Sequence, residues 1–359
     1  QYSIYAIYAK AFTYKWPIMV GSSVNRPAAD RYSALMADNT AIKSATESLL
    51  FSTVPNQGSY NNFRFDLGTA PGGSETETIS IRSTAISNAI PLVISGAGTT
   101  ASDTIKWTTV DNFASNSAID ILEDVSSASI AASALQKWRL DQWGDNQHMY
   151  SASTANLSTT AARYMGVQDT SGLGTAAGGA TQVLPEAGTF KTFRGRLNDT
   201  LTAGSYTATL VKNGVDTAVV LTFTDGSMQS DTSNTVTVTT GDTIYWRIDP
   251  STPTAPSNAR AISISCEYQS DVAGNGILLS GNNANASNSV TVYNTWYGCG
   301  AWNATEGNVT ALAGDITVTK IRMLLSAQPG AGSPTKSRTI TLRDDGADTA
   351  ATVAISGTG

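Results

Sequence analysis

The sequence predicts an all-β protein made of tandem antiparallel β-sandwich, jelly-roll-like domains. Three observations predict this fold: short alternating apolar runs separated by turn residues, a low content of charge, and one strand-and-turn pattern that occurs three times. Charged residues are 14% of the chain, below the roughly 25% of ordinary soluble domains. The chain also contains 31 glycines. Such a composition favours strands and tight turns over helices.

The clearest copy of the repeated pattern runs from Gly188 to Gly226. Two β-rich runs in it flank Asn213 and Gly214. Asn-Gly between such runs is the strongest short-range hairpin signal, because a type I′ turn needs positive φ at both central residues. The sequence therefore predicts a hairpin whose turn is centred on Asn213 and Gly214.

Two further copies match this one. Near the C-terminus, Arg343–Thr349 matches Val211–Thr217 position for position. Near the N-terminus, the copy from Phe63 to Gly96 lacks Asn-Gly and carries Ala85–Ala89 instead, so a different turn is expected there. A repeat period of roughly 130 residues is far above the 20 to 50 of solenoids. Each copy is therefore large enough to carry its own core.

The repeats predict a division into a closing strand or exchanged segment at 1–17, sandwiches at 18–147 and 148–276, and an incomplete third sandwich at 277–359. Residues 1–17 match the closing strand of a repeat, whereas the third copy stops part-way through its fold. Either the chain is a fragment of a longer array, or the N-terminal segment of this chain or a neighbour supplies strands, as in donor-strand addition. We favour the fragment, because residues 1–17 supply too few strands.

No catalytic, cofactor or metal site is predicted, and we expect a protein that is not an enzyme. The one histidine, His148, is interpreted as a linker residue, because a triad or a histidine metal site would need partners that no repeat provides. Asp344–Asp348 resembles a calcium loop only superficially, since it matches the Asn-Gly turn and lacks the full ligand spacing. Paired carboxylates for glycoside hydrolysis are left open as an alternative, although Asp103, Asp231 and Asp242 stand at turn positions, where capping and Asx-turns explain them.

One ligand-binding site can be suggested from the aromatic residues. Trp296, Tyr297 and Trp302 lie close together beside glycines and could form a platform on which a sugar stacks. Burial of these tryptophans in a core is the alternative, and we favour it. Cys266 and Cys299 are interpreted as two independent thiols, with a disulfide between them left open.

Charge and hydropathy exclude two classes of partner. The net charge of −6 argues against binding to nucleic-acid backbones, which requires clustered Lys and Arg. No run of 18 apolar residues occurs, so we expect no membrane insertion.

The repeated pattern resembles β-sandwich modules of virion surface proteins of tailed phages, such as fibres, spikes and head decorations. The segments that carry the resemblance are a Gly-Thr-Phe strand start, a Thr-Ala-Gly-Ser loop, an Asn-Gly-x-Asp-Thr turn, a Val-x-Val-x-x-Gly-Asp motif and a Pro-rich link, at 188–190, 202–205, 213–217, 236–242 and 250–256. It covers essentially the whole chain as about two and a half copies, and the first copy departs from it at the hairpin turn. The resemblance implies a structural, self-associating role with no catalytic residues to carry over.

We therefore expect a non-enzymatic structural protein of a virion appendage or an extracellular filament, located on the virion surface or outside the cell. Its expected partners are other copies of itself or other virion or filament proteins, with a host glycan receptor as a further candidate. The alternatives are a bacterial surface adhesin or fibre subunit, and a carbohydrate-binding array attached to a hydrolase.

Overall fold

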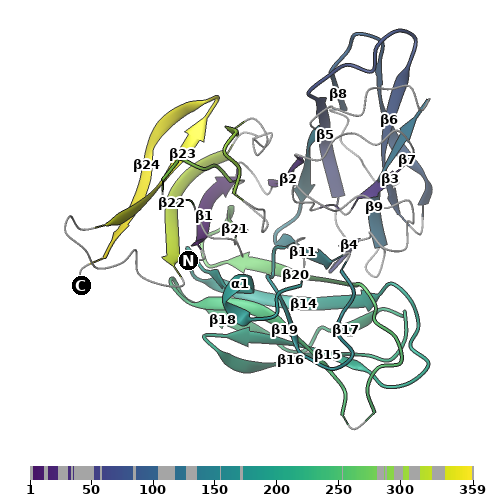
Figure 1. The fold of residues 1–359 in the computed structure, drawn as a ribbon, viewed down its shortest axis with the longest axis vertical. Coiled ribbons are helices and arrows are strands. Elements are labelled where there is room, and N and C mark those ends of the chain that lie inside the picture. Colours follow the sequence, from purple (N-terminus) through teal and green to yellow (C-terminus); the bar gives the residue numbers. More distant parts are fainter. Residues whose placement is uncertain are drawn as a thin grey trace.

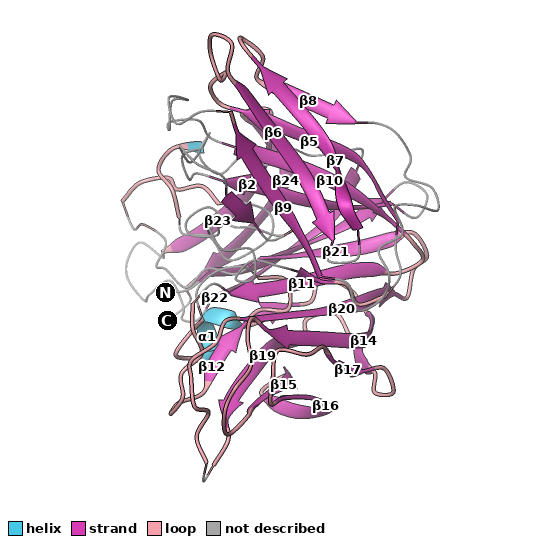
Figure 2. Ribbon diagram, turned by 90° about the vertical axis from the view of Figure 1, so that its right-hand side faces the viewer, coloured by secondary structure: helices cyan, strands magenta, loops and turns pink. Residues whose placement is uncertain are grey.

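The computed structural model describes residues 3–11, 15–22, 31–33, 35, 52–56, 59–83, 86–103, 118–126, 136–153, 155–169, 173–252, 254–280, 287, 289–294, 302–306, 316–325 and 336–357. These residues form antiparallel sheets and one short α-helix, α1 (Ala177–Ala180) (Figures 1 and 2). The predicted all-β, antiparallel, sandwich-type fold is confirmed. No helix in this part of the chain is long and apolar enough to cross a membrane.

The first sheet pair comes from residues 15–143 of the chain. One sheet has the strand order β2-β10-β5-β8, and the other has the order β3-β9-β6-β7 with β4 also paired to β9. The strands are β2 (Lys15–Ser22), β3 (Arg31–Ser33), β4 (Ser52–Thr53), β5 (Ser59–Leu67), β6 (Thr76–Ser83), β7 (Ile86–Ser95), β8 (Thr100–Asp103), β9 (Ala118–Val125) and β10 (Gln136–Trp143). Apolar side chains from both sheets share one core, in which Phe65 stacks on Trp138 with ring centroids 5.9 Å apart.

The second sheet pair follows directly in the chain. One sheet has the order β11-β20-β14-β17 with β18 also on β14, and the other has the order β12-β19-β15-β16 with β13 on β19. The strands are β11 (Gln147–Ser153), β12 (Arg163–Met165), β13 (Gln182–Val183), β14 (Gly188–Leu197), β15 (Tyr206–Lys212), β16 (Val215–Phe223), β17 (Gln229–Asp231), β18 (Val236–Val238), β19 (Thr243–Pro250) and β20 (Ile262–Ser270). Its core is again shared by both sheets, with Phe193 edge-on to Trp246 at 5.9 Å.

The two sheet pairs have the same topology. Strands β2, β10 and β5 of the first pair hold the places of β11, β20 and β14 in the second, and β3, β9, β6 and β7 hold those of β12, β19, β15 and β16. The short strands β4 and β13 pair with β9 and β19 in the same way. This correspondence supports the tandem arrangement, which stays a prediction.

A third sheet pair contains the N-terminal strand of the chain. Its strands are β1 (Ser3–Ala11), β21 (Asn275–Ser280), β22 (Ile316–Leu325), β23 (Ser337–Asp344) and β24 (Ala347–Ser356), in sheets ordered β21-β1-β22 and β23-β24. Strand β1 lies between β21 and β22, which is the place that β10 and β20 hold in the other pairs (Figure 1). The N-terminus of this chain thus supplies a strand to the sheet that its C-terminal third begins.

The Asn-Gly turn forms the predicted hairpin. Asn213 and Gly214 have φ of 51° and 77°, and Asp345 and Gly346 have φ of 45° and 78° at the matching turn. Both turns therefore have the left-handed conformation that a type I′ hairpin requires, and the Asp-rich segment near the C-terminus is a turn in β23–β24. In the first copy the structure differs from expectation, because residues 86–89 belong to strand β7 rather than to a turn.

We expect Ile7→Pro to destabilise the third sheet pair. Ile7 pairs with both Leu278 and Ile321 in the middle of a sheet, where proline cannot donate a ladder hydrogen bond and is not tolerated. The loss should be at least about 1 kcal/mol, the net value of one hydrogen bond. Hydrogen exchange should quicken in β21 and β22 and stay unchanged in β15 and β16. Ile7→Val is the control, and equal exchange in both variants would contradict the placement of β1.

Candidate functional site

A cluster of polar side chains, most of them buried, lies on the outer face of sheet β11-β20-β14, away from that pair's own core. Along β20 the side chains alternate: Ile262, Ile264 and Cys266 enter the core. Ser263, Ser265 and Glu267 point the opposite way and are nevertheless buried. The first sheet pair covers them. We call this cluster the polar junction and define it by Thr53, Asn56, Tyr60, Gln142, His148, Tyr150, Thr192, Arg194, Ser263, Ser265 and Glu267.

Strand β4 of the first pair lies against β20 of the second. The Thr53 backbone N–H donates to Ser263 Oγ at 3.2 Å, and the Thr53 hydroxyl donates to Ser265 Oγ at 2.8 Å. Thr53 is fully buried, so these bonds satisfy groups that would otherwise be costly to bury. The serines of β20 are therefore suited to receive a strand from the neighbouring sheet pair.

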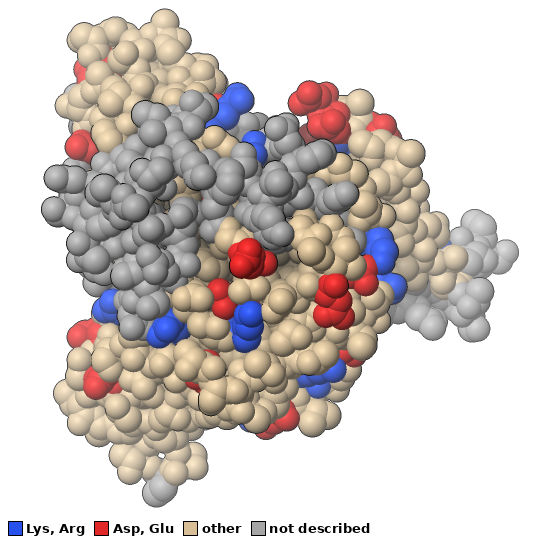
Figure 3. Space-filling view, turned by 180° about the vertical axis from the view of Figure 1, so that it is seen from behind, with Lys and Arg blue, Asp and Glu red and all other residues tan. Residues whose placement is uncertain are grey.

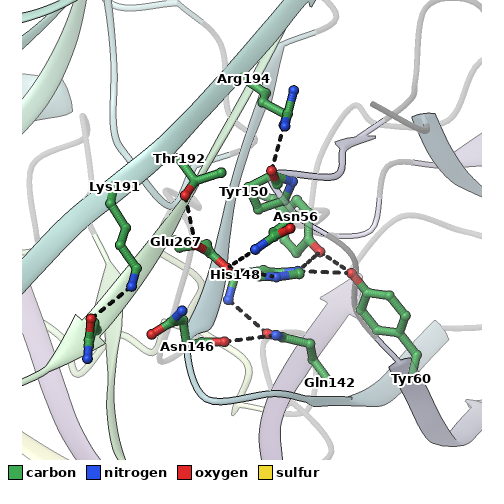
Figure 4. Close-up of polar contacts among 12 residues, drawn as sticks. Asn56, Tyr60, Gln142, Asn146, His148, Tyr150, Lys191, Thr192, Arg194 and Glu267 are labelled. Carbon is green, nitrogen blue, oxygen red and sulfur yellow. Dashed lines mark hydrogen bonds and ion pairs between the residues drawn. The ribbon is translucent and has the colours of Figure 1, made fainter. Parts of the chain in front are cut away.

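Glu267 joins three elements at the centre of the junction (Figure 4). Its carboxylate accepts hydrogen bonds from Asn56 Nδ2 at 3.2 Å and from Thr192 Oγ1 at 2.8 Å. Thr192 has φ of 52° at the bulge in β14, a conformation that a β-branched residue rarely adopts. The bulge turns the Thr192 hydroxyl toward Glu267. Beside it, Arg194 Nε donates to the Pro55 carbonyl at 2.6 Å.

His148 and two tyrosines form the other half of the junction. The hydroxyls of Tyr60 and Tyr150 are 2.5 Å apart, and each lies 3.2 Å from His148 Nδ1 (Figure 4). The backbone N–H of His148 donates to Gln142 Oε1 at 2.8 Å. Tyr60 and Gln142 come from the first sheet pair, whereas His148 and Tyr150 lie on β11 of the second. The network therefore crosses the boundary between the two pairs.

Burial keeps the His148 imidazole and the Tyr60 and Tyr150 hydroxyls uncharged. Desolvation lowers the pKa of His148 to about 3, although His148 Nε2 lies 3.8 Å from Glu267 Oε1. Burial raises the pKa of the Tyr60 and Tyr150 hydroxyls well above its usual value. At neutral pH the imidazole is neutral and both phenols keep their protons. These three groups are thus suited to fixed hydrogen bonds rather than to proton transfer.

A related set of contacts joins the second and third sheet pairs. Strand β13 lies against β1, β21 and β22, just as β4 lies against β20, β11 and β14. Gln147 Nε2 donates to the Ile277 carbonyl at 2.8 Å and Gln147 Oε1 accepts from the Ile277 N–H at 2.9 Å. Glu186 forms an ion pair with Lys320, and this pair lowers the pKa of the Glu186 carboxyl.

The structure corrects one site interpretation and places others. His148 is not a linker residue: it lies in strand β11, where it is fully buried. Trp302 is half-buried, and Trp296 and Tyr297 lie outside the described residues, so the sugar platform stays a prediction. Cys266 is a buried free thiol whose pKa burial raises, and Cys299 lies outside the described residues.

The turn interpretation of the acidic residues is confirmed in the second sheet pair, but it is wrong for Asp103, which lies in strand β8 and pairs with Phe63 of β5. Asp231 accepts hydrogen bonds from the backbone N–H groups of Ser233 and Asn234. Asp242 accepts from Thr239. Within the described ranges, no group of three His, Cys, Asp or Glu side chains is arranged to hold a metal ion.

No protein-family model matches the chain, and no curated protein matches it. On the face seen in Figure 3, the coloured basic and acidic residues are interspersed rather than gathered into a patch of one sign. Inference about function therefore comes from the geometry of the polar junction.

We expect the protein to lose stability as the pH falls from about 6.5 toward 3. His148 has a folded pKa of about 3, against about 6.5 in the unfolded chain. Between these values only the unfolded state binds the proton, so the free energy of unfolding falls with pH by up to about 1.4 kcal/mol per unit.

The measurement is denaturant unfolding between pH 7 and pH 5, where no other histidine titrates because the chain has one. His148→Gln should flatten the slope, whatever its effect on stability at pH 7. An unchanged slope in this variant would contradict a buried neutral His148.

The two tyrosine hydroxyls should be energetically coupled. Tyr60→Phe and Tyr150→Phe each remove one side of the 2.5 Å contact, and neighbours in one network show coupling of about 0.5 to 3 kcal/mol. A double-mutant cycle in chemical denaturation measures it. Tyr206→Phe, at a buried tyrosine of the second core, combined with Tyr60→Phe is the control and should be additive. Additivity of Tyr60→Phe with Tyr150→Phe would argue against the network.

Proposed function

We propose that this chain is a non-enzymatic structural protein of a virion appendage or extracellular filament, which assembles through its β-sandwich units. The observation that carries the proposal is the way the sheet pairs are joined. Their contacts bury hydrogen-bonded polar groups between sheets, so the units form one continuous body rather than domains on flexible linkers.

The chemistry of the junction also favours a structural role. Its imidazole and phenols are enclosed and neutral at physiological pH, whereas catalytic acids and bases have pKa values near the working pH and reach a substrate. Buried networks of this kind specify one arrangement of the parts they join. A subunit that transmits load or keeps a fixed shape needs such an arrangement.

The strand from the N-terminus supports the same role. Strand β1 joins the third sheet pair and then leads directly into β2 of the first. The chain therefore ties its first and third pairs together through the backbone as well as through side chains. Closure of this kind resists separation of the units, which is useful in a particle exposed to the environment.

We expect the purified chain to assemble in a concentration-dependent way. Sedimentation velocity over a hundredfold range of concentration should show species larger than the 37.4 kDa monomer, with a fraction that grows with concentration. Negative-stain electron microscopy of the same samples should show rings or filaments of regular spacing. A single monomeric species at every concentration would contradict self-assembly.

A further inference from the structure

One sheet of the first pair and one sheet of the second end in a strand that has a single partner. This strand is β7 in the first pair and β16 in the second, and no other described strand is hydrogen-bonded to either. Strand β16 lies on the side of the second pair that faces away from the first (Figures 1 and 2). The open edge of such a strand carries backbone N–H and C=O groups with which another strand can pair.

The backbone groups of Val220 and Thr222 point to the open edge of β16. The Ser205 carbonyl, just before β15, accepts a hydrogen bond from the Ser251 N–H on the side of β19 at 2.8 Å. Successive residues of a strand direct their backbone groups to opposite sides, so the next residue of β15 bonds on the side of β16, where it is paired with Phe223. The same alternation along β16 directs the backbone groups of Val220 and Thr222 away from β15, and both residues are exposed.

The open stretch of β16 starts after Ala218. Asn234 Nδ2 donates to the Ala218 carbonyl at 3.2 Å, so a side chain of the chain itself occupies the edge at that point. The segment 219–224 that follows contains no charged residue and no proline. Sheets generally protect an open edge with charge or proline, and this stretch has neither. Val220 is 43% exposed, although its side chain is apolar.

The first pair protects the same place with a proline. Pro91 holds in β7 the position that Val220 holds in β16, because their partners Ser80 and Thr209 match in the repeat. Gly96, an odd number of residues further along, donates its N–H on the side of β6, so alternation directs Pro91 to the open edge. Proline has no N–H, is tolerated at such an edge, and prevents a further strand from pairing there. The second pair lacks this protection at the equivalent place.

We propose that the open edge of β16 joins two copies of this chain, whose β16 strands pair antiparallel about a two-fold axis at Leu221. Val220 of one copy then lies opposite Thr222 of the second copy, and the two residues exchange backbone hydrogen bonds. The sheet β12-β19-β15-β16 continues into the equivalent sheet of the second copy. This inference rests on the proposed self-assembly and names the surface through which it operates.

The occupant is a second copy because the open stretch is complementary to itself. Pairing about Leu221 matches the two residues whose backbone groups are open, Val220 and Thr222, with each other, as a two-fold contact requires. This pairing leaves the Ala218 carbonyl bonded to Asn234. The Leu221 side chain stays on the buried face in both copies. No like charges meet across the contact, because the paired stretch is uncharged.

The test compares the wild-type chain with Val220→Pro in sedimentation equilibrium. Pro91 shows that the fold accepts proline at this place of the repeat, and a circular dichroism spectrum like that of the wild type will verify it. Since the two-fold contact loses an N–H from each copy, the dissociation constant of the dimer should rise about tenfold or more. In the wild type, amide hydrogen exchange at Val220 and Thr222 should slow as the concentration rises, while exchange at Leu221, which is paired with β15, stays unchanged.

A second pair of variants tests the same surface without changing the backbone. Val220→Lys places two like charges close together across the proposed axis and should weaken the dimer. Val215→Lys is the matched control, because Val215 is exposed next to the β15–β16 turn, outside the open stretch, and this variant should sediment like the wild type. Unchanged association of both Val220 variants would overturn the proposal and leave self-assembly through another surface. A wild-type chain that stays monomeric, with exchange at Val220 independent of concentration, would overturn both.

Discussion

Sheet β11-β20-β14 is covered on both faces. Every polar atom that its outer face buries therefore needs a hydrogen-bond partner. Its inner face is apolar and packs in the second core. Its outer face carries Ser263, Ser265 and Glu267, which are buried by another part of the chain. The need for hydrogen-bond partners explains the position of the first sheet pair, because a surface that covers the outer face must place hydrogen-bond donors opposite Ser263, Ser265 and Glu267. Asn56 and Thr53 provide them.

The sequence predicted features that depend on local chemistry. Asn-Gly at 213–214 needs positive φ, and this requirement alone places the turn of the β15–β16 hairpin. The alternation of Ile262 to Tyr268 likewise predicts a strand with one apolar face. Alternation does not reveal that Ser263 and Glu267 are buried, because the sequence of a strand is the same whether water or a neighbouring sheet covers its polar face. The linker interpretation of His148 is wrong for a related reason, because its partners in the structure, Tyr60 and Glu267, lie far from it in the sequence.

The third sheet pair shows how little of a sandwich can be predicted from its hairpin. The turn at Asp345 and Gly346 repeats the φ values at Asn213 and Gly214, and Thr349 donates to the Leu342 carbonyl as Thr217 donates to Leu210. The hairpin is thus locally determined. Its burial is not, because it depends on which strands lie next to it. The same inward pattern is buried in the second pair and half-buried in the third.

Strands β1 and β22 pair although they are far apart in the sequence, for example at Ile7 and Ile321. The equivalent strands of the first sheet pair, β10 and β5, are much closer in the sequence, for example at Trp138 and Phe65. Loop-closure entropy grows only with the logarithm of loop length, at about 0.6 kcal/mol per doubling. Closing the longer loop therefore costs only about 1 kcal/mol more free energy than closing the shorter one. The difference is smaller once the intervening sheet pairs have folded and shortened the effective loop. Distance in sequence is then no obstacle to β1.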